Sequence, residues 1–401
     1  MLRRLIVLIL LAACVPTPTD SDLNNPNSIN PESETVRGVP TQPPPDWLDS
    51  TEAVTLDTVP RIQLLGRLDS TLAPSTIFDH SLSPDGTRLA GLDNEQLIVW
   101  DLITGETLFS TGRRESTRVF FSADKTEVYA VELSGLVSIH NAENGTTQNT
   151  FSGINDYESV VAYYDEDGWL AFGNREGQVR VWDPIERTAL VTFDAHDLAV
   201  RQMKFSDDGE WLATADNVGG VKVWDWRNRT LIAEINNERP AQALSIAPDK
   251  TRLAAGSSEN IRLWSLPGGE FERLLDTGPG AVQVMAFSPD GSLLVNGGDT
   301  PEMLIWNPET GNLVARLPDV GEERLSLVFS PDGSLLLTSV LNGPVTLWNM
   351  TTITESTVNR ADLNIGENFV YNVDWTSDSR LLTLFGMTGS VYLWGIPPTS
   401  G

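Results

Sequence analysis

The sequence Val221-Lys222-Val223-Trp224-Asp225 decides the fold, because near-copies of it recur along the chain. Each copy is a short, mostly apolar run with tryptophan as its fourth residue, a pattern typical of a short β-strand. The other copies with tryptophan in this position lie at 97–101, 179–183, 261–265, 303–307, 345–349 and 391–395. A further unit, Val137-Ser138-Ile139-His140-Asn141, has histidine in the tryptophan position. With this unit included, the spacings are 40, 42, 42, 40, 42, 42 and 46 residues.

A short turn sequence repeats in phase with these strands. Phe-Ser-Pro-Asp-Gly occurs at 287–291 and 329–333, and variants occur at 82–86, 121–125, 205–209 and 247–250. Proline and glycine in these positions suit a type I turn. Apolar strands flank each copy, so we predict a β-hairpin at every one. The acidic stretch 163–168 occupies the same place in its own unit, and we interpret it as a hairpin turn rather than a calcium site.

Short strands, a period near 42 residues and a Trp-Asp ending resemble the WD-repeat family. The resemblance covers residues 61–401 and implies an all-β, eight-bladed β-propeller. Seven blades are the alternative, if the His140 unit is not a blade. Each unit supplies three strands, and a fourth follows the tryptophan. Because seven residues follow Trp394, we predict that Arg61–Leu68 completes the last blade and closes the ring.

The units depart from the best-known pattern of this family in their polar residues. The family carries Gly-His near the start of a unit, and here Ala195-His196 resembles it most. We expect the family's aspartate six residues before the tryptophan. At that position the chain has Asn94, Glu176, Val218, Ser258, Thr300, Asn342 and Thr388. We therefore predict that most blades lack a polar network around the tryptophan and rely on apolar packing.

The start of the chain resembles a bacterial lipoprotein signal. Met1–Arg4 is basic, residues 5–13 are apolar, and Leu11-Ala12-Ala13-Cys14 resembles a lipobox. The resemblance implies cleavage before Cys14 and lipidation of its thiol. The protein would then be extracytoplasmic, anchored to the outer face of the cytoplasmic membrane or to the outer membrane. The apolar run is short beside the roughly 20 residues of a membrane-spanning helix. An ordinary signal peptide with a chance cysteine is the alternative.

Composition separates a tether from the propeller. Residues 1–13 are the predicted signal peptide, and residues 14–60 are predicted to be a disordered tether rich in Pro, Thr, Ser and Asp. The chain as a whole has a net charge of −28, which argues against a nucleic-acid partner. Cys14 is the one cysteine in the sequence, so an intrachain disulfide is excluded.

The sequence contains no recognisable catalytic motif, and we expect neither a metal nor a cofactor. His80, His140 and His196 fall in different units, without the spacing of metal ligands. We interpret His140 as a packing residue and His80 as a core or channel-lining residue. For His196 we expect a structural hydrogen bond or a surface contact. Trp226 lies off the repeat, and we expect it to be buried under a neighbouring blade or to form an exposed contact.

The family resemblance implies that partners bind the face formed by loops between blades and between second and third strands. On this face we nominate Tyr157, His196, Arg239, Asp299 and Glu322 as candidate contacts. The predicted function is a lipid-anchored scaffold or sensor, a monomeric propeller that binds protein partners and is not an enzyme. One alternative is a propeller hydrolase, lactonase or dehydrogenase that acts on a small molecule. Another is an accessory lipoprotein of outer-membrane assembly.

Overall fold

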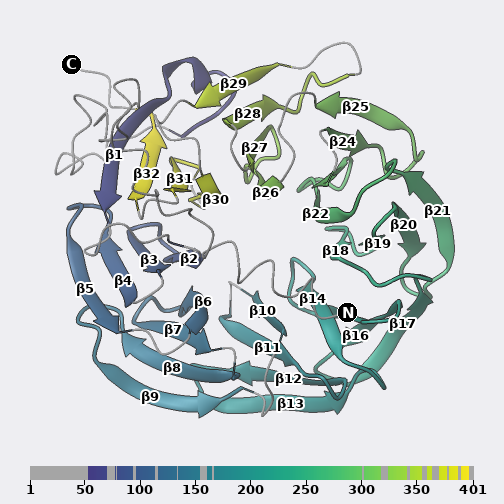
Figure 1. Ribbon diagram of the computed structural model, residues 1–401, viewed down its shortest axis with the longest axis horizontal. Coiled ribbons are helices and arrows are strands. Elements are labelled where there is room, and N and C mark those ends of the chain that lie inside the picture. The colour runs from purple at the N-terminus through teal and green to yellow at the C-terminus, as the bar shows by residue number, and fades with distance from the viewer. Residues whose placement is uncertain are drawn as a thin grey trace, which may run out of the picture. The chain divides into compact units, whose positions relative to one another are not determined.

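The computed structural model describes residues 53–69, 77, 79–93, 96–112, 116–132, 134–153, 160–164, 167–299, 302–317, 324–340, 344–354, 359–363, 370–376, 379–386 and 390–396. All of these belong to one compact unit of the chain, Val39–Gly401. They form 32 β-strands and a short 3-10 helix, η2 (Val59–Arg61). The strands make eight four-stranded sheets, arranged as blades around a common centre (Figure 1). The prediction of an all-β, eight-bladed propeller is therefore confirmed.

In the described chain, seven blades consist of four consecutive antiparallel strands, numbered from the centre of the ring to its rim. Blade 1 comprises β2 (Asp79–Leu82), β3 (Arg88–Leu92), β4 (Gln96–Asp101) and β5 (Thr107–Gly112). Blade 2 comprises β6 (Ser116–Phe121), β7 (Glu127–Glu132), β8 (Leu136–Asn141) and β9 (Thr147–Ser152). Blade 3 comprises β10 (Val160–Tyr164), β11 (Trp169–Gly173), β12 (Gln178–Asp183) and β13 (Thr188–Asp194).

The next four blades follow the same order. Blade 4 comprises β14 (Val200–Phe205), β15 (Trp211–Asp216), β16 (Gly220–Asp225) and β17 (Thr230–Asn236). Blade 5 comprises β18 (Ala243–Ile246), β19 (Arg252–Gly256), β20 (Asn260–Ser265) and β21 (Phe271–Asp276). Blade 6 comprises β22 (Val282–Phe287), β23 (Leu294–Gly298), β24 (Met303–Trp306) and β25 (Leu313–Leu317). Blade 7 comprises β26 (Arg324–Phe329), β27 (Leu335–Val340), β28 (Val345–Asn349) and β29 (Arg360–Leu363).

Blade 8 joins the two ends of the described chain. Its inner strands are β30 (Val370–Trp375), β31 (Leu381–Gly386) and β32 (Ser390–Gly395), and its outer strand is β1 (Gln63–Asp69). β1 pairs antiparallel with β32, with Arg67 opposite Tyr392 and Leu68 opposite Val391. Figure 1 shows this pairing as purple β1 beside yellow β32. The predicted closure of the ring by the first strand is confirmed, and with it a count of eight blades rather than seven.

Packing against blade 8 begins before β1. Val54 is 1% exposed and belongs to the apolar cluster between blades 7 and 8, and its N–H donates to the carbonyl of Ser379 over 2.7 Å. η2 follows, and Val59 packs against the same cluster. These residues precede the predicted domain boundary at Arg61, so the packed chain extends into the segment assigned to the tether. Residues 1–52, including Cys14, lie outside the described residues.

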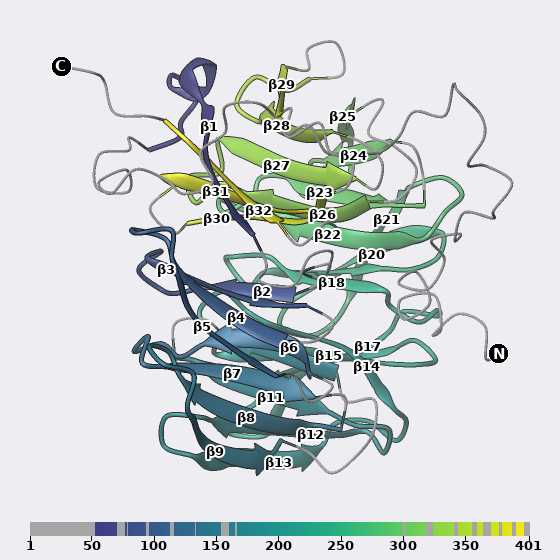
Figure 2. The ribbon, with the colours of Figure 1, turned by 60° about the vertical axis from the view of Figure 1, so that its left-hand side comes forward.

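The core lies between the blades, because each sheet packs both of its faces on its neighbours. Figure 2 shows this stacking, with β6 beside β2. Trp226, which lies off the repeat, is fully buried in this layer. Its ring meets that of Trp169 edge-on at 5.3 Å, and its indole N–H donates to the carbonyl of Gly209 over 2.8 Å. Burial under a neighbouring blade is therefore confirmed for Trp226.

Outer strands carry a β-bulge where they pass the tryptophan position. The pairing register shifts there in seven of the eight blades of the described chain, and β29, four residues long, has no shift. In blade 4 the shift lies between Val223 and Trp224. A bulge interrupts the row of backbone groups that another strand would pair with. The rim is thereby protected from edge-to-edge association.

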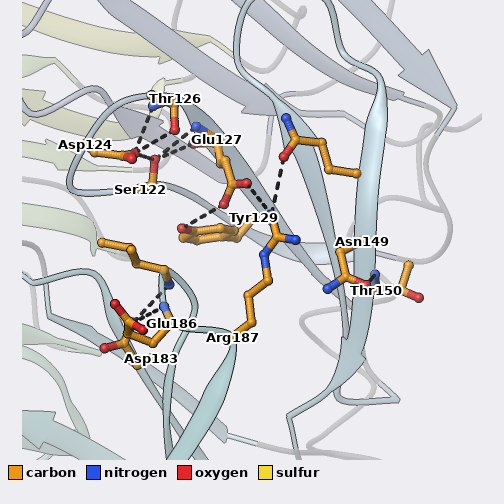
Figure 3. A network of polar contacts seen from close by, with 12 residues as sticks. Ser122, Asp124, Thr126, Glu127, Tyr129, Asn149, Thr150, Asp183, Glu186 and Arg187 are labelled. Atoms are coloured by element: carbon orange, nitrogen blue, oxygen red, sulfur yellow. Dashed lines mark hydrogen bonds and ion pairs between the residues drawn. The ribbon is translucent and has the colours of Figure 1, made fainter.

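The predicted hairpins connect the first and second strands and share one hydrogen-bonded turn. In five of them a serine hydroxyl donates to the aspartate two residues later over 2.6–2.7 Å, at Ser83, Ser122, Ser206, Ser288 and Ser330, whereas the turn at 247–250 has Ala247 in the serine position. Figure 3 shows the turn at Ser122, which lies beside an ion pair between blades. There Arg187 of blade 3 lies 3.0 Å from Glu127 of blade 2. The acidic stretch at 163–168 also joins two paired strands, β10 and β11, as predicted.

Candidate interaction surface

Two sets of connections lie on one face of the ring, opposite the serine turns. They are the turns between second and third strands and the loops from each fourth strand to the next blade. They share a face because antiparallel strands alternate in direction. The structure describes this face most completely over blades 3 to 5. We call residues 174–177, 194–199, 216–219 and 236–242 the blade 3–5 surface.

A row of buried polar side chains fixes the position of the loop that carries His196. Nε2 of His196 lies 2.7 Å from Oγ1 of Thr214, and Nδ1 lies 3.6 Å from Oδ2 of Asp216. Trp224 donates its indole N–H to the same Thr214 oxygen over 3.2 Å. All four side chains are buried. His196 therefore makes a structural hydrogen bond and does not itself present a surface to a partner, which confirms one of its two interpretations.

The distances between these polar groups indicate where the Thr214 hydroxyl proton and the His196 ring proton lie. The Thr214 hydroxyl accepts from Trp224 and lies 2.7 Å from Nε2 of His196 but 3.4 Å from the Lys222 carbonyl. We assign its proton to the nearer acceptor, Nε2, and the ring proton to Nδ1, facing Asp216. Burial lowers the pKa of His196, and the Asp216 carboxylate opposes this shift without reversing it. The imidazole is therefore neutral at pH 7, the form that this assignment requires.

Asp216 also shapes the turn that follows it. Its Oδ1 accepts the backbone N–H groups of Val218, Gly219 and Gly220 over 2.9, 2.9 and 2.8 Å. Asp216 stands eight residues before Trp224, two residues ahead of the position at which we expect the family's aspartate and where this chain has Val218. Blade 4 therefore has a polar network around its tryptophan, of the kind that we predicted most blades to lack.

The other blades show which position decides whether the indole N–H of the tryptophan has a hydrogen-bond acceptor. Where the residue ten before it is polar, the indole N–H is bonded: Trp306 donates to Asn296 over 2.8 Å, and Trp348 donates to Thr338 over 2.9 Å. The remaining four blades that carry the tryptophan have Ala90, Phe172, Ala254 and Leu384 at this position. Among the described residues, the indole N–H groups of Trp100, Trp182, Trp264 and Trp394 are buried without a partner. Those four blades rely on apolar packing, as the sequence predicted.

Backbone contacts join neighbouring loops of the blade 3–5 surface. The carbonyl of Gly177 accepts the N–H groups of Ala195 and His196 over 2.9 and 3.0 Å, and the carbonyl of Gly219 accepts that of Asn237 over 2.8 Å. Gly177 has a φ of +85°, and a Cβ there would lie 1.8 Å from the His196 carbonyl. No other residue fits that position. The surface is therefore a connected and rigid set of loops.

Several side chains of the blade 3–5 surface face solvent. Leu198 and Val218 are 42% and 58% exposed, although both are apolar. Arg239, one of the nominated residues, is exposed and lies 3.0 Å from Glu259 in the adjacent turn. Leu198 and Val218 are not among the residues nominated from the sequence. Their signal was an apolar side chain within a turn, which composition alone does not separate from a buried one.

Of the other nominated residues, one can be placed. Asp299 follows β23 on the same face, is exposed, and accepts a hydrogen bond from the Gln283 side chain. Tyr157 and Glu322 lie outside the described residues, and their nomination stays a prediction. The structure thus brings His196 and Arg239 onto neighbouring loops and places Asp299 in blade 6.

The remaining histidines have structural surroundings. His80 stacks on Phe385 at 3.6 Å and lies 3.6 Å from Asp374, so it packs between blades 1 and 8. His140 is buried in the tryptophan position, with Nε2 at 3.1 Å from Ser138. Its interpretation as a packing residue is confirmed. Within the described ranges no three His, Cys, Asp or Glu side chains gather as a metal site would require. Nor does a described helix have the length and apolarity to cross a membrane.

A comparison with family models agrees with this geometry. The model described as "WD domain, G-beta repeat" matches residues 187–225. This segment holds His196, Thr214, Asp216 and Trp224, the complete network of blade 4. The eight blades show the fold of a β-propeller, and the match shows that one of its repeats, residues 187–225, is similar to the WD repeat.

Known proteins with similar sequences are larger than this chain. "Telomerase protein component 1" of Rattus norvegicus is 23% identical over 255 residues, which are 59% of this chain and 10% of that protein. "Protein FIZZY-RELATED 3" of Arabidopsis thaliana is 24% identical over 205 residues, 50% of this chain and 42% of that protein. The chain therefore spans less than half the length of either relative.

Among solved structures, Sqt1 from Chaetomium thermophilum covers 82% of this chain and 98% of its own, with a TM-score of 0.69 and 14% identity. The computationally designed protein Ika8 covers 82% of this chain and 99% of its own, with a TM-score of 0.68 and 19% identity. A further structure shows the Chaetomium thermophilum Sqt1 bound to the N-terminus of the ribosomal protein L10, with a TM-score of 0.67 and 15% identity. At these identities the likeness shows the fold alone.

Proposed function

We propose that the protein is a lipid-anchored, extracytoplasmic scaffold or sensor that binds a protein partner through the blade 3–5 surface. One observation carries the proposal. Buried polar contacts fix the loops of this surface, while Leu198 and Val218 project from them into solvent. A rigid surface has little conformational entropy to lose when a partner binds, and exposed apolar side chains gain from burial.

The comparisons support a binding role. Sqt1, whose fold is similar, is named as bound to a segment of another protein, the N-terminus of L10. The described histidines are held by structural contacts, and the described acidic residues form no metal cluster. We propose that the protein acts through binding and not through catalysis.

The anchor is supported by the sequence. Leu11-Ala12-Ala13-Cys14 resembles a lipobox, and Cys14 is the one cysteine of the chain. Two or more acyl chains at Cys14 would hold the protein stably at a membrane surface, since each buried methylene contributes about 0.8 kcal/mol. The propeller would then meet its partner outside the cytoplasm.

Crosslinking in intact cells tests the binding role. The full chain is expressed beside a variant with Asp197, Val218 and Arg239 replaced by alanine, all exposed on the blade 3–5 surface. The matched control replaces Ile185, Arg229 and Asp249, which are exposed on the opposite face. We expect one dominant partner with the wild type and the control, and its loss with the surface variant. A wild type that captures no protein would overturn the proposed function.

Fractionation tests the anchor separately. The full chain is expected in the membrane fraction, and its mobility in a gel is expected to change when labelled fatty acid is incorporated. Cys14→Ser should abolish the label and release the chain into the soluble fraction. An unlabelled wild type in the soluble fraction would contradict the anchor and leave the binding role standing.

A further inference from the structure

We infer that Leu198, Val218 and Asp197 form one contact patch that takes a basic protein segment carrying an apolar side chain beside its lysine or arginine. The inference rests on the proposed function and names the chemistry of its partner. Leu198 and Val218 are apolar and exposed to solvent on the blade 3–5 surface. In the described chain the other exposed large apolar side chains lie on the rim or in the turns of the opposite face, at Ile103, Ile185, Leu190, Leu231, Phe271 and Leu274.

The two apolar residues of the patch sit on loops that are bonded to one another. Leu198 follows His196 by two residues, and Val218 follows Asp216 by two. His196 and Asp216 lie 3.6 Å apart, and the N–H of Val218 donates to Asp216 over 2.9 Å. The positions of Leu198 and Val218 are therefore fixed by a single buried pair. Rigid placement of this kind is what a preformed contact site needs.

The charged side chains around Leu198 and Val218 indicate which charge a partner should carry beside its apolar side chain. Asp197, adjacent to Leu198, is exposed and forms no ion pair with a described residue. Arg239, whose backbone packs against Gly219 in the Val218 turn, is already paired with Glu259 at 3.0 Å, and Lys222 lies 3.5 Å from Glu234. Asp194 and Glu176 add further exposed carboxylates on the same surface. A free acidic group beside exposed apolar side chains complements a cation beside an apolar side chain.

The net charge selects among partners of that chemistry. With −28 over the whole chain, phosphate groups of nucleic acid or of an anionic lipid surface are repelled. A basic protein segment is attracted at long range and then held by the apolar contact. The charge therefore favours fast association, and Leu198 and Val218 supply the affinity that survives in salt.

A labelled peptide tests the patch on the full chain. The probe is Gly-Lys-Leu-Gly-Lys-Leu-Gly, and its binding is followed by fluorescence anisotropy in 150 mM salt, about the physiological ionic strength. We expect Leu198→Ser with Val218→Ser to weaken binding at least fivefold. The matched control, Leu231→Ser with Phe271→Ser, should leave it within twofold. A probe with serine in place of leucine should bind the wild type at least fivefold more weakly.

Asp197→Lys is the second variant, since an exposed side chain can change charge without affecting folding. This substitution should weaken binding of the labelled peptide at least fivefold at low salt. Unchanged binding by the double serine variant, or equal binding of the serine probe, would overturn the patch. The cell experiment keeps the two proposals apart. A partner captured equally by the wild type and by Leu198→Ser with Val218→Ser would overturn the patch but not the binding function.

Discussion

The indole N–H of Trp348 donates a hydrogen bond to the hydroxyl of Thr338, ten residues earlier, over 2.9 Å. Both side chains are buried between blades. The same offset joins Trp306 to Asn296 and Trp224 to Thr214. Where that position is apolar, the indole N–H has no partner among the described residues. A single residue in the second strand therefore decides whether the tryptophan of a blade is satisfied.

Thr338→Val should destabilise the protein by about 1–3 kcal/mol, because it leaves a buried donor without an acceptor. Valine keeps the shape of threonine, so the loss reports the hydroxyl alone. Chemical denaturation followed by tryptophan fluorescence measures the change. Thr338→Ser, which keeps the hydroxyl, is the control and should lose less. Equal stability of the valine variant and the wild type would refute the role assigned to this hydrogen bond.

Blade 5 allows the reverse experiment, because Ala254 stands ten residues before Trp264, whose indole N–H lacks a partner in the described structure. Ala254→Thr supplies an acceptor, and Ala254→Val adds the same volume without one. We expect the threonine variant to be more stable than the valine variant by about 1 kcal/mol. The comparison cancels the cost of extra volume in a packed layer. A valine variant as stable as the threonine one would count against the rule.

The serine turns predict a loss of stability in acid. Hydrogen bonds from the Ser288 hydroxyl and the Ser292 N–H lower the pKa of Asp290 below its ordinary value of 3.8. A carboxyl with a lowered pKa stabilises the fold above about pH 4, and this contribution is lost as the pH falls through the folded-state value. Asp290→Asn should therefore cost up to about 1 kcal/mol at pH 7, since the carboxylate faces solvent. Its difference from the wild type should shrink as the pH falls below about 4.

Asp249→Asn is the matched control for that measurement. It lies in the turn where Ala247 replaces the serine, so that hydroxyl bond is missing from the start. The asparagine variant at 249 should lose less at pH 7 than the one at 290. Equal losses at both turns would show that the serine hydroxyl contributes nothing measurable.

Because β1 closes the ring, we expect truncation of Leu68 in this strand to lower the stability of the protein strongly. This side chain of β1 is buried in the apolar cluster of blades 8 and 1. Leu68→Ala should cost about 2–5 kcal/mol, as for a leucine removed from a packed core. Leu231→Ala, on the exposed rim of blade 4, should change stability by less than about 1 kcal/mol. A small effect at Leu68 would mean that β1 contributes little to holding the ring closed.

The sequence was sufficient for the fold because its signals are local and repeated. Trp224 and its counterparts mark the third strands, the Ser-Pro-Asp-Gly turns mark the hairpins, and Arg61–Leu68 was left over to close blade 8. The packed chain starting at Val54 escaped prediction. Its burial depends on the surface that blade 8 offers, and a sequence pattern does not reveal such a surface.

The candidate site was predicted less well. His196 was assigned correctly to a structural bond, but its partner Asp216 lies two residues before the position at which the family's aspartate was expected. A spacing pattern marks one position and does not reveal that a carboxylate elsewhere in the same turn reaches the histidine. Leu198 and Val218 were missed for a related reason. Whether an apolar residue in a loop is buried depends on neighbours distant in sequence.

Photo-crosslinking from a single position tests the central claim most directly, namely that this protein binds a partner through the blade 3–5 surface. A benzoylphenylalanine is placed at Val218 in one version of the full chain and at Leu231 in another, both exposed in the structure. Irradiation of intact cells should give one discrete adduct from position 218 and none from position 231. Adducts from 231 alone, or none from 218, would contradict the account.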